Sequence, residues 1–228
     1  MFAHLNTHST FSKMRGTASP QELLVRAQAH GQQYLALTEV NGLWGFIRFV
    51  QFAREAAIKP IAGTNILSAG EDTILLAESQ QGYENLCRII SAVHDDAAQS
   101  VTDLLAKWKT GLFVLSHQET VLAKLARFMP ETQLFVELRP GVTERHAWQL
   151  SRLFHLEIVA TGDIYFLNPA DQKTHKILRA IDKNKTLSQL ESGDYKSERH
   201  FFPFNQTITP LAILSINNDI SVAFQDDA

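Results

Sequence analysis

Two residues near the N-terminus, Asn6 and His8, have the spacing of a metal clamp in which one ligand is missing. In an extended strand alternate side chains share a face, so these two point the same way, as the two imidazoles of a His-x-His metal site do. His4 shares that face, but four strand residues separate it from His8 by ~13 Å, too far for one shared ion. This stretch therefore indicates metal-assisted hydrolysis with an incomplete ligand set.

Further polar residues stand at the ends of apolar runs along the chain. These are Glu39, Asn65, His117 and Asp163, each placed where a loop would begin at the carboxyl end of a strand. In barrels of alternating strands and helices these ends meet on one face and carry the functional groups. Carboxylate oxygens and imidazole nitrogens are ligands for magnesium, manganese and zinc. We therefore expect His8, Glu39, His117 and Asp163 to be the candidate ligands of one site.

The elements that must position these residues alternate along the sequence. Ser19, Pro20 and Glu22 form a capping box with proline in the first turn, so a helix is predicted to run to about residue 30. After an extended stretch at residues 2–12, apolar runs predict strands at 34–38, 59–66, 73–77, 112–116, 134–138 and 157–161. Periodic segments predict helices at 46–53, 83–93, 121–128, 143–154 and 169–181. The alternation predicts one α/β domain with a parallel sheet closing into a barrel.

Composition excludes several classes of protein. The chain has 228 residues, 45% hydrophobic and 20% charged, with a formal net charge of -3, which gives no reason to expect strong nucleic-acid binding by this chain alone. The longest basic cluster, at residues 173–185, is diluted by Asp182 and is interpreted as a solvated helix face. Cys87 is the single cysteine, which excludes an internal disulfide and a zinc finger, and no apolar run is long enough for a membrane helix. We expect a cytoplasmic protein with no membrane partner.

Several segments in fixed order carry a family resemblance. They read "HLNTHSTFS", "SPQELLVRAQAHG", "LALTEVNGLWGFIRFVQFAREAAIKPIAG", "ILLAESQQGYENLCRIISAVH", "VELRP" and "VATGDIYFLNPADQKTHKILRAI", and together they span residues 2 to 182. The chain resembles the N-terminal polymerase-and-histidinol-phosphatase (PHP) domain of the bacterial DNA polymerase III alpha subunit. Within that family it is most similar to the error-prone branch, in which Asp-Gly-Leu-Tyr-Gly is the counterpart of residues 41–45 here.

The resemblance implies a distorted, seven-stranded, TIM-like β/α barrel. Its strand ends hold up to three metal ions through His, Asp and Glu ligands. In the first motif of this chain Asn6 replaces a histidine while His8 remains, and Arg15 replaces the acidic residue that follows. In the second motif Glu39 stands for the aspartate and Val40 for the histidine.

The later motifs show the same pattern of loss. Asn65 replaces the glutamate of the third strand, and Asp72 aligns with a histidine. His117 falls where some relatives place a ligand, whereas in the late Asp-x-His motif Asp163 is kept and Tyr165 replaces the histidine.

Three of these replacements oppose metal binding on physical grounds. Val40 has no lone pair, Arg15 brings a permanent positive charge, and Asn65 removes an anionic ligand. We therefore expect no catalytic residues, no bound metal and no other cofactor.

The four candidates His8, Glu39, His117 and Asp163 are then vestigial. His8 is expected to hydrogen-bond Asp163 or Asn6. Arg15 is expected to contact Glu39 or Asp163 and so to replace the lost metal charge.

The expected function is that of a non-catalytic PHP-type structural and interaction module in DNA replication or lesion bypass. Its partners would be the remainder of a polymerase III alpha-like chain or other replication and repair subunits. The sequence is predicted to form one PHP-like domain over residues 1–228, in which 183–228 is a C-terminal extension leading toward a palm domain that this chain lacks. The parent family polymerises DNA, but the palm carboxylates are not in this portion.

The alternative is an active metal-dependent phosphoesterase, either a 3'-5' exonuclease or a small-molecule phosphatase. That function would require Zn, Mn or Mg at His8, Glu39, His117 and Asp163, because a metal-bound hydroxide would attack phosphorus. The sequence leaves both functions open.

Overall fold

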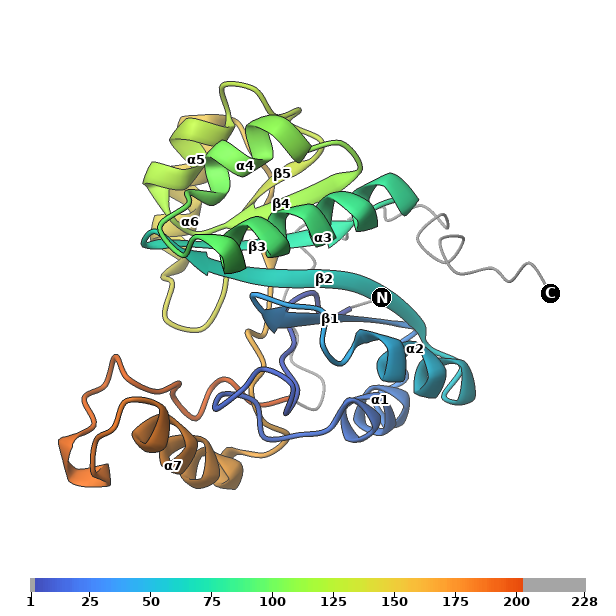
Figure 1. Cartoon of the computed structure of the whole chain (residues 1–228), viewed down its shortest axis with the longest axis vertical. Helices are drawn as coiled ribbons and strands as arrows, with labels where there is room; N and C mark the ends of the chain where they lie inside the picture. The colour runs from blue at the N-terminus through green and yellow to red at the C-terminus, as the bar shows by residue number, and fades with distance from the viewer. Residues whose placement is uncertain (1–2, 203–228) are drawn as a thin grey trace.

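The computed structural model describes residues 3–202 and shows a sheet that curls into a half-barrel (Figure 1). Its strands, within the described residues, are β1 (Tyr34–Val40), β2 (Lys59–Ser68), β3 (Glu71–Ala77), β4 (Leu112–Ser116), β5 (Leu134–Leu138) and β6 (Ile158–Ala160). They are hydrogen-bonded in the order β1-β2-β3-β4-β5-β6. All six lie at the predicted places, and the mixed α/β class is confirmed.

Both faces of the sheet are buried, which explains the continuous apolar runs. In β1 the alternation of side chains places Leu35 and Leu37 in the layer beneath the helices and Ala36 in the interior of the curl. The interior layer is completed by residues from the other strands and the N-terminal segment: Leu5, Ile61, Ile74, Leu76, Phe113, Leu115, Phe135 and Val159. This apolar plug supports the polar groups at the strand ends.

The prediction of a uniformly parallel sheet is wrong for β3. The pairs β2–β3 and β3–β4 are antiparallel, whereas β1–β2, β4–β5 and β5–β6 are parallel. The cause is a two-residue turn, in which Ala69 and Gly70 both adopt positive φ angles, 51° and 75°. Such a turn joins adjacent antiparallel strands directly, so no crossover helix is needed between β2 and β3.

The expected seventh strand is not confirmed, because residues 4–8 form isolated bridges in place of a regular strand. His4 bridges to Leu35 of β1, and Thr7 bridges to Ile164, which follows β6. The backbone donates and accepts on both sides, from Ala36 to the carbonyl of His4 and from His8 to the carbonyl of Ile164. This N-terminal segment therefore lies between the first and last strands of the sheet.

The described residues form seven α-helices and two short 3-10 helices, of which the first six α-helices pack around the sheet (Figure 1). The predicted capping box is present, since Ser19 and Glu22 bond reciprocally at the start of the first helix. One helix, at residues 101–108, was not predicted from the sequence. The helices are α1 (Pro20–Ala29), α2 (Phe46–Glu55), α3 (Gln80–Asp95), α4 (Val101–Trp108), α5 (Glu119–Leu125), α6 (Glu144–Phe154), η1 (Pro169–Asp171), α7 (Gln172–Asp182) and η2 (Leu187–Gln189).

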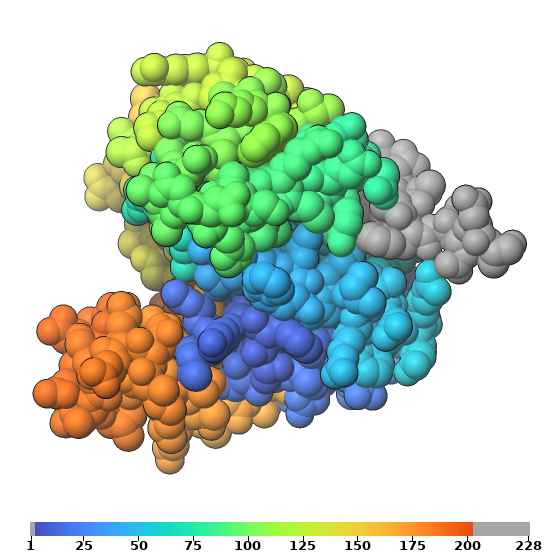
Figure 2. All heavy atoms as spheres, in the orientation of Figure 1, coloured from blue at the N-terminus to red at the C-terminus, as the bar shows by residue number. Residues whose placement is uncertain are grey.

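After β6 the chain forms a protruding lobe with α7 and η2, drawn in orange in Figures 1 and 2. Residues 194–202, called the strap here, return from this lobe to the sheet. Tyr165 donates its backbone N–H to the carbonyl of His200, and Phe202 donates to that of Phe166. No helix in residues 3–202 is long and apolar enough to cross a membrane. Most of the predicted extension toward a palm domain, residues 203–228, lies outside the described residues.

Candidate functional site

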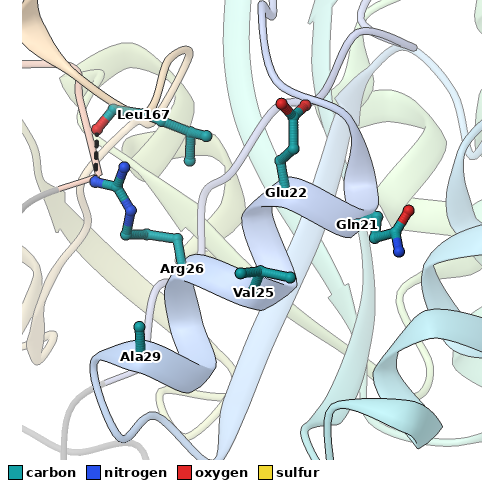
Figure 3. A pocket seen from close by; sticks show the side chains of 6 residues that line it. All are labelled: Gln21, Glu22, Val25, Arg26, Ala29 and Leu167. Atoms are coloured by element: carbon teal, nitrogen blue, oxygen red, sulfur yellow. Dashed lines mark hydrogen bonds between the residues drawn. The ribbon is translucent and has the colours of Figure 1, made fainter.

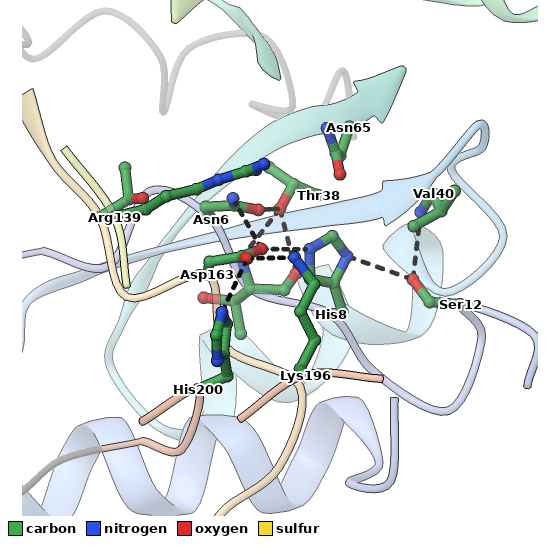
Figure 4. Close-up of polar contacts among 12 residues, drawn as sticks. Asn6, His8, Ser12, Thr38, Val40, Asn65, Arg139, Asp163, Lys196 and His200 are labelled. Carbon is green, nitrogen blue, oxygen red and sulfur yellow. Dashed lines mark hydrogen bonds and ion pairs between the residues drawn. The ribbon is translucent and has the colours of Figure 1, made fainter. Parts of the chain in front are cut away.

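Polar side chains gather at the carboxyl ends of β1, β5 and β6, in a cluster called the mouth here (Figure 4). Its centre consists of Asn6, His8, Glu39, Glu137 and Asp163, and each of these residues is at most 1% exposed. A buried carboxylate is costly unless a cation or hydrogen-bond donors satisfy it. The partners of the three carboxylates therefore decide what the mouth can do.

Asp163 is held by a cation from the strap. Lys196 Nζ lies 2.5 Å from Asp163 Oδ2, and His200 Nε2 lies 3.4 Å from the same oxygen. The other oxygen, Oδ1, lies 3.5 Å from His8 Nε2 and accepts a hydrogen bond of 3.2 Å from Asn6 Nδ2. Burial opposes ionisation of Asp163, but Lys196 and the nearby His200 and His8 outweigh it, so the pKa of Asp163 lies well below its usual range.

Asn6 joins two carboxylates through its side-chain amide. Nδ2 donates to Glu137 Oε1 and to Asp163 Oδ1, both at 3.2 Å, and Oδ1 accepts from the hydroxyl of Thr38 at 3.0 Å. A metal-binding imidazole would offer a lone pair at this position, whereas the carboxamide offers two N–H donors toward acids. Asn6 thus suits a mouth held together by hydrogen bonds.

Glu137 is neutralised from the end of its own strand by Arg139. The two guanidinium nitrogens reach different acids: Nη1 lies 3.5 Å from Glu137 Oε2, and Nη2 lies 2.6 Å from Asp72 Oδ2. His117 sits beside this cation, with Nε2 3.2 Å from Arg139 Nη2 and Nδ1 3.6 Å from Glu137 Oε2. Thr161 donates its hydroxyl to Glu137 Oε1 at 2.5 Å. Burial opposes ionisation of Asp72, but the charge of Arg139 prevails and lowers the pKa of Asp72.

Glu39 is satisfied by hydroxyl groups. Ser9 and Ser12 donate to its two carboxylate oxygens, and the backbone N–H of Ser9 points at both. Burial nevertheless raises the pKa of Glu39, and these donors offset only part of that effect. Ser12 also lies 3.4 Å from His8 Nδ1, which places Ser12, His8 and Asp163 in the order of a hydrolytic triad. The Ser12 hydroxyl donates its one proton to Glu39 and not to His8, as a triad serine would, and Ser12 is only 1% exposed.

The candidates from the sequence are brought together, but by different partners from those expected. His8 lies beside Asp163 as predicted, and His117 lies beside Glu137. The expected contact of Arg15 with Glu39 or Asp163 is wrong, because Lys196 occupies the Asp163 carboxylate and Arg15 pairs with neither acid within residues 3–202. Within that range no three His, Cys, Asp or Glu side chains are placed to hold one metal ion.

Sequence reasoning missed four functional residues: Glu137, Arg139, Lys196 and His200. Glu137 and Arg139 could have been found from the sequence, since they stand at the end of the apolar run of β5 just as Glu39 stands at the end of that of β1. Lys196 and His200 had none, because they belong to no motif and follow Asp163 by 33 and 37 positions in a segment without a regular strand. Only the return of the strap to the mouth brings them there.

Comparison with known proteins decides the family of this arrangement. The family model described as "PHP domain" matches residues 4–184. The chain belongs to the PHP domain family. This PHP domain is 32% identical over 237 residues to the error-prone DNA polymerase of Pseudomonas aeruginosa, covering 94% of this chain and 22% of the relative. It is 27% identical over 235 residues to the DNA polymerase III subunit alpha of Buchnera aphidicola, covering 88% of this chain and 20% of the relative.

The fold also matches solved structures at low sequence identity. A two-domain protein of Bacteroides vulgatus, described as containing a predicted PHP-like metal-dependent phosphoesterase, aligns with a TM-score of 0.51 and 15% identity. The alignment covers 72% of this PHP domain and 51% of that chain. The present chain spans about a fifth of the length of the polymerase relatives, 20% and 22% in the two cases above. These similarities show the family and the fold, whereas the activity depends on the chemistry of the residues in the mouth.

Proposed function

We propose that this chain is a non-catalytic PHP domain that serves as a structural and interaction module of a DNA polymerase III alpha-like, error-prone polymerase. One observation carries the proposal: protein cations stand where a metal cluster would have to stand. Lys196 binds Asp163, and Arg139 spans Glu137 and Asp72. Three acids that a cation cluster would need are thus already neutralised within the fold, and the two oxygens of the fourth, Glu39, accept hydrogen bonds from Ser9 and Ser12.

The residues present do not fit a metal cluster of the family type. An ammonium nitrogen 2.5 Å from Asp163 Oδ2 leaves no room for an ion at that oxygen. Asn65 uses its amide to donate to Asp72 Oδ1 at 2.8 Å, so it turns an N–H toward the acid. Tyr165 stacks on His8 with ring centroids 4.1 Å apart, in place of the motif's histidine. These contacts favour a mouth that stabilises the fold over one that hydrolyses phosphate esters.

The partners follow from the relatives, which are polymerases about five times longer. We propose that the remainder of such a polymerase, or another replication or repair subunit, is the partner, in the cytoplasm. The family match ends at residue 184, which supports 183–228 as an extension toward a palm domain. We further propose that residues 4–8 take the place of the seventh strand of a TIM-like barrel, since they bond to both β1 and the segment after β6.

Metal analysis tests the proposal directly. The chain is purified in medium with manganese and zinc, its metal is measured by mass spectrometry, and hydrolysis of a p-nitrophenyl phosphate ester is assayed. We expect fewer than ~0.3 metal equivalents and the same background hydrolysis as in the Asp163→Asn variant, because a hydrolytic site retains its activating ion. Chelation with EDTA should leave the melting temperature unchanged.

The same experiment decides the alternative, an active phosphoesterase. Stoichiometric metal that is lost in Asp163→Asn, together with hydrolysis that disappears in the same variant, would overturn the scaffold function. Hydrolysis that persists in Asp163→Asn would come from a contaminant. The description of the Bacteroides vulgatus neighbour motivates this alternative, but no contact in the mouth favours it.

A further inference from the structure

Helix α7 buries polar side chains and exposes apolar ones, the opposite of an ordinary surface helix. Its buried residues include the polar Gln172, His175 and Arg179, whereas Ile177 is 48% exposed and Ile181 is 60% exposed. A surface helix of a soluble protein normally turns its apolar stripe toward the core. The outward isoleucines of α7 therefore require an explanation.

The polar inner face is fixed by hydrogen bonds to backbone groups of the strap and of the loop at Arg15. Gln172 Nε2 donates to the carbonyl of Lys196 at 3.0 Å, and Arg179 Nε donates to that of Asp194 at 2.9 Å. His175 bridges the two segments, donating from Nδ1 to the carbonyl of Arg15 at 2.6 Å and accepting at Nε2 from the backbone N–H of Lys196 at 3.0 Å. Rotating the helix to bury the isoleucines would break all four bonds.

The lobe exposes three large apolar side chains. Ile177 and Ile181 stand one turn apart on the helix, and η2, which contacts α7, exposes Leu187 by 58%. Within residues 3–202, three of the eight exposed large hydrophobic side chains thus fall within positions 177–187. Figure 2 shows that this lobe projects away from the rest of the molecule, so its outer face is open to a partner.

The charges that border this face are mainly basic. Lys173 is exposed one turn before Ile177 and forms no ion pair within the described residues. Lys183 and Lys185 follow Ile181 and lie 3.9 and 2.8 Å from Asp194, and Glu191 also lies near Lys185. The one acid of the helix, Asp182, is engaged by Arg179 at 2.6 Å. A second copy of this chain would bring lysines against lysines, whereas a segment with acidic borders would complement them.

We propose that the outer face of α7 and η2, centred on Ile177, Ile181 and Leu187, is the docking surface for an amphipathic helix with an apolar stripe and acidic borders. Two isoleucines one turn apart form a ridge that fits between the side chains of another helix. The proposal deepens the scaffold function, on which it rests, by naming the surface and the chemistry of the partner. Most of residues 173–185 are exposed, as the interpretation of a solvated helix face requires, and the proposal adds a docking role to that face.

A designed peptide provides the probe. A fluorescein-labelled 18-residue peptide carries leucine at helical positions a, d and e of each heptad and glutamate at the flanking positions, and its matched partner carries lysine instead. Binding to the full chain is followed by anisotropy. We expect the glutamate peptide to bind at least ~10-fold more tightly than the lysine peptide, and the double variant Ile177→Glu/Ile181→Glu to weaken it at least ~10-fold.

The control variant is Val25→Glu, which changes another exposed aliphatic side chain in the pocket along α1 (Figure 3). Val25 is 57% exposed, so the control alters a comparable surface elsewhere and should bind the peptide as the parent chain does. Melting temperatures within about 2 °C of the parent would show that the variants fold, as expected for exposed sites.

Three outcomes of the peptide assay would overturn the proposal. These are absence of peptide binding at 1 mM, equal affinity for the two peptides, and equal weakening by Val25→Glu. Self-association abolished by Ile177→Glu/Ile181→Glu would assign the face to a second copy and would also overturn it. If the peptide does not bind but the chain is free of metal and inactive, the docking surface is wrong and the scaffold function still holds. Bound metal with hydrolysis would overturn that function whatever the peptide does.

Discussion

The two sides of the mouth solve the same electrostatic problem with cations of different origin. On one side Arg139 directly follows β5, whose residue Glu137 it neutralises, and it reaches Asp72 as well. On the other side Lys196 comes from the strap and reaches Asp163, 33 residues earlier in the chain. The first ion pair stabilises one corner of the sheet, whereas the second also connects the α7 lobe to the loop that follows β6. Substitutions of the two cations should therefore differ in how much unfolding free energy they remove and in how far from the mouth amide exchange changes.

The largest effect is expected from Lys196→Met, which keeps a long aliphatic chain against Tyr165 but removes the charge. Asp163 is 0% exposed and cannot rehydrate without local opening. We expect a loss of about 3 kcal/mol in the free energy of unfolding, measured in urea, because removing one partner leaves a buried charge. Amide exchange at Tyr165 and Phe202, whose N–H groups bond to His200 and Phe166, should become faster.

A second substitution separates charge from packing at Lys196. Adding Asp163→Asn to Lys196→Met removes the orphaned charge, so the double variant should recover about 1 kcal/mol relative to Lys196→Met alone. A loss below about 0.5 kcal/mol in Lys196→Met would contradict a stabilising buried ion pair between Lys196 and Asp163, since surface ion pairs contribute only that much.

A smaller loss, about 2 kcal/mol, is expected for Arg139→Met. The Asp72 side chain is 20% exposed and can rehydrate, and Glu137 keeps the donors Asn6 and Thr161. Amide exchange at Tyr165 and Phe202 should stay as in the parent chain, because the strap is not involved. The matched control is Arg152→Met on the exposed side of α6, which should change stability by less than about 0.5 kcal/mol. A greater loss of unfolding free energy for Arg139→Met than for Lys196→Met would contradict the expectation that Lys196 contributes more to stability.

The smallest effect concerns His175, which links α7 to the strap. Burial lowers its pKa from 6.5 to about 4, against the raising effect of its bond to the carbonyl of Arg15. Because the unfolded chain takes up this proton at higher pH, the stability that neutral His175 gives is complete above about pH 6.5 and is lost as pH falls toward 4. Between pH 7 and pH 5.5 the loss should be about 1 kcal/mol smaller in His175→Gln than in the parent chain.

The difference between the two proteins is the quantity to measure, since other buried histidines also titrate. Burial likewise lowers the pKa of His4, to about 3, and this group contributes equally to both proteins. Urea unfolding at pH 7, 6 and 5.5 gives the two slopes. Identical slopes for the parent chain and His175→Gln would rule out a neutral His175 as the link.

Much of the fold could be predicted because its signals are local. The capping box of Ser19 and Glu22 and the apolar runs of the six strands depend on neighbours in sequence. The direction of β3 could not be predicted, because it depends on Ala69 and Gly70 adopting positive φ in a short turn without a strong turn motif. Of the candidate residues, His8 and Asp163 lie side by side as expected. The cation beside Asp163 was predicted to be Arg15, which is near His8 in sequence, but it is Lys196.

The sequence by itself determined the family and the places of the six strands, since these depend on ordered motifs and on local apolar runs. It also predicted that ligands are missing at positions 6, 40, 65 and 165, but only the tertiary structure decided which groups surround the acids of the mouth. Lys196 and His200 reach Asp163 because the strap returns to the mouth, and α7 turns its isoleucines outward because its polar side chains bond to that same strap. Both outcomes depend on contacts between segments distant in sequence, and pairing over such distances leaves no local pattern to detect.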